Sequence, residues 1–261
     1  MIKLRETLAR RLNRTQEVRH KSWPVREMVE QLTALSDAQF GQYAFLHEPL
    51  EGKFSAAQKE QYIQAANRCG QETAASWEAR LSGGADCSES QPSRLLTKLA
   101  GQLGVTVQDE TVPIGGGHVL FAQFVEPNRI TIFRDCLERL DLLIRDEGLE
   151  DLFEGVDFRS VLLAHELFHA VEFAQKDRIY TQTEKVELWR KPFSNKSRIL
   201  VLSEIAAMAF AKALCRLSFS PYALDVLLMY SYHADAACAL YEEIMAAAGL
   251  PLTQETGEEP C

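Results

Sequence analysis

Two histidines and a glutamate in the segment Val161–Val171 have the types and spacing best suited to catalysis. The segment reads VLLAHELFHAV and contains the pattern HExxH. Residues four apart lie on one face of a helix, so His165 and His169 can present both imidazoles to one metal ion. Glu166 follows the first histidine and can reach a water on that metal without being a ligand. The spacing predicts a zinc site with Glu166 as general base.

A third protein ligand is expected on another element, because catalytic zinc sites use three protein ligands and keep one position open. Glu204 is the best candidate. It is the lone carboxylate in the apolar run Ile199–Leu217, where an unpaired charge would be costly. The sequence leaves open a buried ion pair of Glu204 with Arg198 or Lys212. We expect Glu204 to complete a set of two histidines and one carboxylate, which suits Zn²⁺.

Further polar residues near these positions are alternatives for other roles. Glu172 shares the helix of the histidines, so it is expected to support a ligand or to form a salt bridge. Asp177 and His233 are alternative third ligands. Tyr230, Tyr232 and His233 cluster after the expected glutamate ligand and are candidates to stabilise an oxyanion. The same cluster also fits partly buried core residues of a helix.

The order of these motifs resembles that of a known enzyme family. The sequence LAGQLGV from Leu99 precedes the predicted strands, HELFH follows them, and EIAAMAFA from Glu204 matches the pattern ExxAxxFA. This order is similar to the zincin metallopeptidases of the gluzincin type, and most of all to the ImmA/IrrE-type peptidases, over roughly residues 94–217. The resemblance implies a zincin-like fold, the same three zinc ligands, and Glu166 as the base in peptide hydrolysis.

Three features depart from the family pattern. Phe168 follows HEL, where the family commonly has glycine. The stretch 170–203 between the second histidine and the glutamate is longer than usual. Met208 lies four residues past Glu204, where thermolysin-like enzymes carry an aspartate that supports a ligand. These differences concern the subfamily more than the metal site.

Together these residues predict a zinc-dependent metallopeptidase that hydrolyses a peptide bond with metal-activated water and Glu166 as general base. The substrate would be a peptide or protein, extended beside the predicted strand 118–125 by analogy with zincins. Two alternatives stay open: a zinc hydrolase of a non-peptide amide, and a metal-binding regulatory protein without catalysis. The intact Glu166 argues against the second alternative, because a structural zinc site needs no base.

The surrounding sequence predicts an α+β fold, mainly helical, with a small three-stranded sheet next to the HExxH helix. Strands are expected where β-branched and aromatic residues gather between glycines and prolines, at 105–107, 118–125 and 129–133. Helices are expected at 55–81, 94–104, 137–147, 157–176, 197–217 and 222–248, the last in one or two pieces.

The chain is expected to divide at a linker. Residues 1–90 would form a helical N-terminal region and residues 91–261 a zincin-like metallopeptidase domain. The stretch 82–92 is rich in Ser, Gly and acidic residues, as linkers often are. Ser55 and Ser93 are predicted helix caps on either side of this linker.

Composition and charge narrow the functional classes. The 261 residues are 46% hydrophobic and 25% charged, with a formal net charge of −9, which argues against general nucleic-acid binding. The stretch Lys3–Lys21 is an exception, with five arginines and two lysines. It predicts a solvated helix face or, alternatively, an arm that contacts a partner.

The cysteines and the apolar runs indicate the compartment. Six cysteines are scattered without a close pair, which is typical of reduced thiols in the cytosol. The N-terminus has no apolar stretch of the signal-peptide kind. The longest apolar run, 199–217, is interrupted by charged residues that a membrane span would not tolerate. We expect a soluble, cytoplasmic protein that does not enter a membrane.

Overall fold

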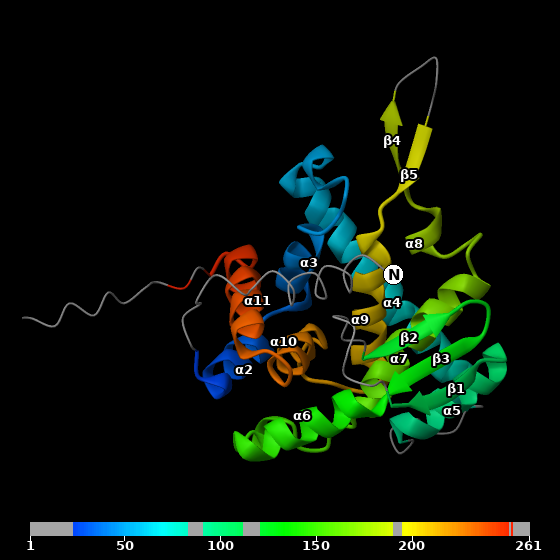
Figure 1. Ribbon diagram of the computed structural model, residues 1–261. Coiled ribbons are helices and arrows are strands. Elements are labelled where there is room, and N and C mark those ends of the chain that lie inside the picture. Colours follow the sequence, from blue (N-terminus) through cyan, green and yellow to red (C-terminus); the bar gives the residue numbers. More distant parts are fainter. Residues whose placement is uncertain (1–22, 83–90, 112–120, 190–194, 251, 253–261) are drawn as a thin grey trace, which may run out of the picture.

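The computed structural model combines many helices with two small groups of strands (Figure 1). The predicted class, α+β with mostly helix and a small three-stranded sheet, is confirmed. The basic N-terminal stretch, most of the predicted linker and the start of the predicted strand 118–125 lie outside the described residues. The structure describes residues 23–82, 91–111, 121–189, 195–250 and 252.

The helices account for most of the described chain. The α-helices are α2 (Val25–Ala34), α3 (Asp37–Phe45), α4 (Ala56–Ser82), α5 (Pro92–Leu103), α6 (Arg134–Asp146), α7 (Phe158–Ala174), α8 (Tyr180–Thr183), α9 (Val201–Leu214), α10 (Tyr222–Tyr230) and α11 (Ala234–Ala247). Two short 3-10 helices are η1 (Glu51–Lys53) and η3 (Glu150–Leu152). The strands are β1 (Thr106–Glu110), β2 (Ala122–Val125), β3 (Arg129–Phe133), β4 (Lys185–Trp189) and β5 (Asn195–Arg198).

The three-stranded sheet is mixed and has the order β1-β3-β2. The central strand β3 pairs in parallel with β1 and antiparallel with β2. Ile130 and Ile132 are fully buried, and Thr131 and Phe133, which alternate with them, are also buried. A strand buried on both faces is rich in apolar residues, and Ile130, Ile132 and Phe133 supply them here.

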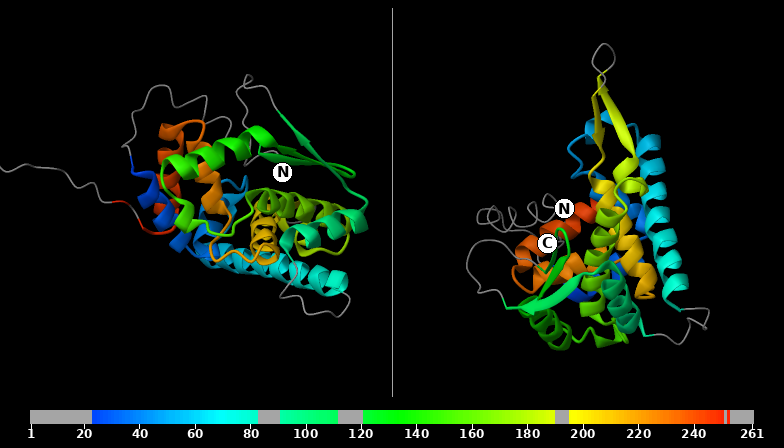
Figure 2. Two further views of the ribbon diagram at one scale, coloured as in Figure 1. Left: turned by 90° about the horizontal axis from the view of Figure 1, so that it is seen from below. Right: turned by 90° about the vertical axis from the view of Figure 1, so that its right-hand side faces the viewer.

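The sheet, α7, α9 and α4 follow one another as layers (Figure 2, left). Helix α7 packs against β2 and β3 on one side and against α9 on the other, and α4 runs along α9. Gly70 of α4 permits this closeness, because a Cβ atom there would lie 2.2 Å from the carbonyl oxygen of Ala206. Helix α4 belongs to the predicted N-terminal region and thus packs on the predicted catalytic part. The boundary near residue 90 stays a prediction.

Both central helices begin at a carboxylate. Asp157 caps α7 and accepts a hydrogen bond from the backbone N–H of Ser160 at 3.2 Å. Helix α9 has no such cap of its own. Instead, buried Glu48 accepts a hydrogen bond from the backbone N–H of Val201 at 3.0 Å. A negative charge at a helix N-terminus is favourable, so the loop after α3 fixes where α9 starts.

The element boundaries differ from the expected ones in a few places. Ser55 caps α4 as predicted, through Gln58. The Ser93 prediction is wrong, because α5 already starts at Pro92, with Gln91 in the cap position. The predicted helix 197–217 is too long, since its first residues belong to β5. Helix α8 and the β4–β5 hairpin were not predicted. The register of the hairpin depends on the pairing of its two strands, which no local sequence pattern indicates.

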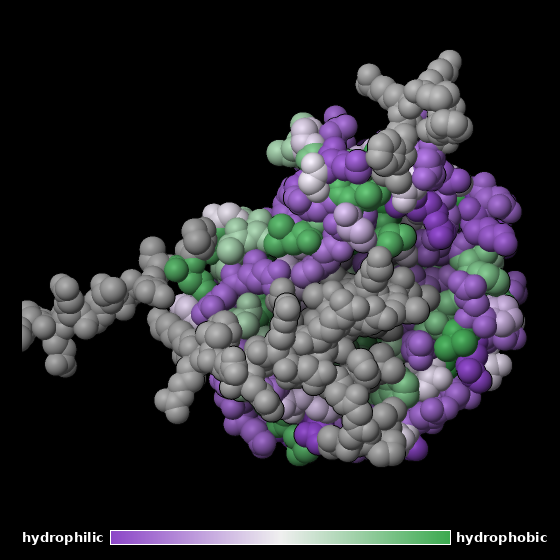
Figure 3. Space-filling model, turned by 45° about the horizontal axis from the view of Figure 1, so that its top comes forward, coloured by the Kyte–Doolittle hydropathy of each residue, from purple (hydrophilic) through white to green (hydrophobic). Residues whose placement is uncertain are grey.

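The described surface is largely polar. Figure 3 shows hydrophilic residues over most of the described part of this face, with hydrophobic residues in small groups. Leu142 is the most exposed of the large hydrophobic residues described, at 52%. Single exposed hydrophobic residues are common on protein surfaces. In the part of the chain that the structure describes, no helix is both long and apolar enough to span a membrane.

Candidate metal centre

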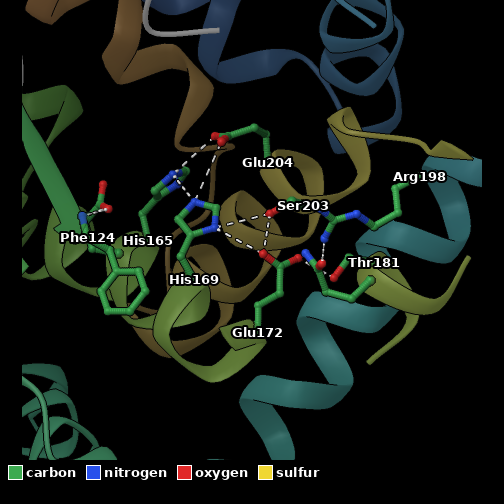
Figure 4. Close-up of polar contacts among 10 residues, drawn as sticks. Phe124, His165, His169, Glu172, Thr181, Arg198, Ser203 and Glu204 are labelled. Atoms are coloured by element: carbon green, nitrogen blue, oxygen red, sulfur yellow. Dashed lines mark hydrogen bonds and ion pairs between the residues drawn. The ribbon is translucent and has the colours of Figure 1, made fainter. Parts of the chain in front are cut away.

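Helix α7 places its two motif histidines side by side in the interior. His165 and His169 are 6% and 2% exposed and lie one turn apart, as the HExxH spacing predicts. Their Nε2 atoms are 3.2 Å apart. The ring centroids are 4.9 Å apart, with the planes at 72°. Both imidazoles therefore direct the same nitrogen to one place between α7 and α9 (Figure 4).

Helix α9 brings Glu204, the predicted third ligand, to the same place. Its Oε2 lies 3.4 Å from His165 Nε2, and its Oε1 lies 3.8 Å from His169 Nε2. Glu204 is 7% exposed. Each of the three side chains offers one ligand atom, and these atoms all lie within 4.8 Å of one another. The structure thus brings all three predicted metal ligands together.

The spacing of these atoms fits one zinc ion. Zinc bonds to nitrogen and oxygen ligands are about 2.0–2.2 Å long, so two ligand atoms of a tetrahedral site lie about 3.3 Å apart. The two histidine nitrogens are 3.2 Å apart, and each lies near this distance from one oxygen of Glu204, at 3.4 Å from Oε2 for His165 and 3.8 Å from Oε1 for His169. Two imidazoles and one carboxylate are also a ligand set that zinc uses in catalytic sites, with a further position open.

The cations that the sequence offered as alternative partners of Glu204 have other contacts. The Lys212 ammonium lies 2.9 Å from Asp37 Oδ2. The Arg198 guanidinium donates to the side-chain oxygen of Gln182. Both cations are therefore engaged away from the candidate centre, while the two histidine nitrogens lie next to the carboxylate.

The second nitrogen of His169 contacts a small polar network. Its Nδ1 lies 3.2 Å from Ser203 Oγ and 3.7 Å from Glu172 Oε2. The Ser203 hydroxyl donates to Glu172 Oε2 at 2.8 Å, and Thr181 donates to the other oxygen of Glu172. Because the single proton of Ser203 goes to Glu172, its oxygen accepts from Nδ1–H of His169. That tautomer leaves Nε2 of His169 as the atom that can bind a metal.

This network extends to the surface. Gln182 also helps to lower the pKa of Glu172, and the side chain of Gln182 accepts a hydrogen bond from Arg198 of β5. Glu172 is 7% exposed, whereas Arg198 is exposed. Polar side chains thus lie between the base of the β4–β5 hairpin and Glu172, which supports a candidate ligand (Figure 4).

Glu166, the predicted base, is fully buried between α7 and the sheet. The backbone N–H of Phe124 in β2 donates to its Oε2 at 2.6 Å. The negative charge of Glu166 favours the protonated forms of His165 and His169, although burial leaves the pKa of His165 lowered, so the carboxylate lies within electrostatic reach of the candidate ligands. The edge strand β2 therefore fixes the orientation of this side chain.

Burial and charge act differently on the two histidines. Burial lowers the pKa of His165, and the neighbouring Glu204 offsets this only in part. Burial would also lower the pKa of His169, but the hydrogen bond with Glu172 and the charges of Glu204 and Glu166 outweigh it and raise that pKa. Burial opposes the charged form of Glu172 as well, yet His169 and its other partners lower its pKa. Glu172 and His169 thus stabilise each other's charged forms.

The other residues suggested by the sequence lie in different settings. Tyr232 donates a hydrogen bond to Asp135 at 2.8 Å. His233 caps α11 through its Nδ1. Tyr230 ends α10 and packs partly against the core, and Asp177 is exposed. None of the four belongs to the group of metal-binding side chains found among the described residues.

Sequence reasoning missed part of the surroundings of the site. Ser203 directly precedes Glu204, and a hydroxyl at that position was the available signal. Thr181 reaches Glu172 because the chain turns back into α8 after α7. The contact of the Phe124 backbone with Glu166 depends on the packing of β2 on α7. Contacts made by backbone groups, or by segments that turn back toward the site, cannot be predicted from the spacing of motif residues.

Compared with known proteins, the chain matches no family model, no curated protein and no solved structure. The indication of function therefore comes from the buried histidines, the carboxylates around them and their distances.

Proposed function

We propose that the protein is a zinc-dependent peptidase in which His165, His169 and Glu204 bind the ion and Glu166 is the general base. The observation that carries this proposal is the convergence of two buried imidazole nitrogens, 3.2 Å apart, with the carboxylate of Glu204, whose Oε2 lies 3.4 Å from His165 and whose Oε1 lies 3.8 Å from His169. A zincin-like arrangement, with the small sheet beside the HExxH helix, belongs to the same proposal. The packing of α7 on β2 and β3 supports it.

The protein's own residues have distinct tasks in the proposed reaction. Bound zinc supplies Lewis acidity, which polarises a carbonyl and lowers the pKa of water. Glu166 accepts the proton of the attacking water and passes it to the leaving amine. The hydrogen bond from Phe124 holds the carboxylate of Glu166 in one orientation. Ser203 and Glu172 keep the ring of His169 turned toward the ion.

The proposed substrate is a peptide or protein that lies extended along β2. This strand is an outer strand in the described sheet order β1-β3-β2. An edge strand can accept a further extended segment by backbone hydrogen bonds. The same strand holds Glu166, so a segment bound along it would pass close to the base.

A cytoplasmic location is part of the proposal. Among the described residues, Cys69, Cys136, Cys215 and Cys238 are free cysteines. Free thiols are typical of reducing compartments, where disulfides do not persist.

Metal content is the first test. We expect about one zinc per chain in the purified protein, measured by mass spectrometry, and loss of zinc in His169→Ala and Glu204→Ala. His233→Ala serves as the matched control, because this histidine caps α11, and it should keep the zinc. A wild-type protein that takes up no metal even after reloading with zinc would contradict the proposed centre.

The second test separates peptidase activity from its alternatives. A peptide library and a set of small amides would be incubated with the wild type and with Glu166→Gln. We expect cleavage of peptides by the wild type and at least about a 100-fold loss in the variant, with zinc retained. Cleavage of small amides alone would indicate a non-peptide amidase. Zinc binding without any cleavage would indicate a regulatory metal protein.

A further inference from the structure

A small cavity adjoins the candidate metal centre on the side of α10. Its volume is about 40 Å³, and it is bounded by α7, α9, α10 and Phe121. His165 and Glu204 form part of its wall. A side chain placed in this cavity would therefore sit directly next to two of the proposed zinc ligands.

The rest of the wall is almost entirely apolar. It includes Leu162 from α7, Met208 from α9, and Leu224 and Leu228 from α10. Besides Glu204, the charged side chain that lines the cavity among the described residues is Asp225. Apolar walls favour an aliphatic group over water, and two carboxylates disfavour an acidic group by repulsion.

The size of the cavity limits what it accepts. About 10–15 Å³ of such space is enough for one water molecule, so this cavity has room for a few heavy atoms. That room suits a short aliphatic side chain and is too small for an aromatic ring. Met208 lines the cavity one turn after Glu204, on the same face of α9, and is 8% exposed.

We propose that this cavity, here called the Met208 pocket, binds a short aliphatic side chain of the substrate next to the scissile bond, and that Met208 sets the size it accepts. This inference rests on the proposed function, because it takes the carbonyl beside the pocket to be the one attacked. The substrate class is thus a peptide with valine, leucine or a residue of similar size at that position. Peptides with an aromatic or acidic residue there are poor substrates.

The test measures binding of small zinc-chelating probes instead of turnover. Hydroxamates of glycine, valine, leucine, phenylalanine and aspartate would be titrated calorimetrically into zinc-loaded, full-length protein. We expect the valine and leucine compounds to bind about 10-fold tighter than the glycine compound, and the phenylalanine and aspartate compounds to bind no tighter than glycine.

Variants then assign the selectivity to the pocket. Met208→Ala should enlarge it and tighten the binding of the phenylalanine compound about 10-fold. Met245→Ala removes a methionine side chain of equal size that is buried in α11, and it should leave the ranking unchanged. Should Met208→Ala not fold, Leu228→Ala enlarges the opposite wall and should change the ranking in the same direction.

The outcomes distinguish the two proposals. Equal affinities for all five probes on zinc-loaded protein, or the same ranking after Met208→Ala and Leu228→Ala, would overturn the pocket assignment and leave the metal centre standing. A protein that binds no zinc would overturn the proposed function, and the pocket assignment with it.

Discussion

The α7–α9 pair and the β4–β5 hairpin carry similar side chains in opposite environments. In the helix pair, the histidines and carboxylates of the candidate centre are at most 7% exposed: His165, Glu166, His169, Glu172 and Glu204. In the hairpin, which projects from the top of the molecule in Figure 1, the charged residues Lys185, Glu187, Lys196 and Arg198 are exposed.

The difference shows that buried charged groups contribute more to stability and to chemistry than exposed ones. Exposed charges keep their water, and their pairs contribute on average about 0–1 kcal/mol. Buried charges have lost their water, so each needs a partner at a defined distance. The polar groups of α7 and α9 meet this need through one another, or through a metal ion between them. We therefore expect the loss of a polar group to have a larger effect in the helix pair than in the hairpin.

The two regions are nevertheless connected. Arg198 at the base of β5 donates to Gln182, Gln182 helps to lower the pKa of Glu172, and Glu172 contacts His169. The hairpin is thus linked to the centre through a line of polar side chains. If buried polar groups matter more than exposed ones, substitutions should have smaller effects on stability and zinc affinity the closer they lie to the surface.

The largest effect is expected where α4 supports the helix pair. Gly70→Ala would place a Cβ atom 2.2 Å from the Ala206 carbonyl oxygen, and backbone cannot yield as a flexible side chain can. We expect a loss of about 3 kcal/mol in the free energy of unfolding, measured by urea denaturation, together with a fall in zinc content. Gly101→Ala is the control, because a Cβ there meets nothing within 4 Å. The variant should be stabilised by up to about 1 kcal/mol. Equal stabilities of the two variants would contradict this packing.

The next effect concerns the support of His169. Glu172→Ala removes the carboxylate that Ser203 and Thr181 contact. We expect zinc affinity to fall about 10–100-fold, measured by competition with a chelator. Glu187→Ala removes an exposed carboxylate of the hairpin and should change neither affinity nor stability by a measurable amount. Equal zinc affinities in the two variants would contradict the expected difference between the helix pair and the hairpin.

Zinc affinity should also depend on pH in a direction set by the raised pKa of His169. A protonated imidazole cannot bind zinc, so affinity should be constant above this pKa and fall as pH drops through it. The slope is about tenfold per pH unit for one displaced proton. In Glu172→Ala the fall should move to lower pH, because that pKa loses its hydrogen-bonded support. An unchanged profile in the variant would argue against the Glu172–His169 pair.

The smallest effect is expected from single hydroxyls. Ser203→Ala removes the oxygen that accepts from His169 and the donor to Glu172. We expect a loss of about 1 kcal/mol of stability and a reduction of a few-fold in zinc affinity. Ser197→Ala in β5 is the control, since its hydroxyl contacts only neighbouring backbone. A larger loss from the hairpin serine would reverse the proposed order.

Local patterns were sufficient for a good part of the structure. Ser55 as a cap and the β-branched residues of β3 indicated a helix and a strand that the structure contains. The HExxH spacing indicated that His165 and His169 share a face. These features operate within a single element, where residues a few positions apart interact in the same way wherever the element lies.

The sequence by itself determined which side chains are available for metal chemistry and which face of α7 carries them. Only the tertiary structure decided that Glu204 meets this face at 3.4 and 3.8 Å, that Thr181 and Ser203 support the site, and that β2 holds Glu166. The pairing of β4 with β5 and the Met208 pocket were likewise decided by the tertiary structure. The physical reason is that these contacts join residues distant in sequence. Their geometry depends on how whole helices and strands pack, down to the missing side chain of Gly70.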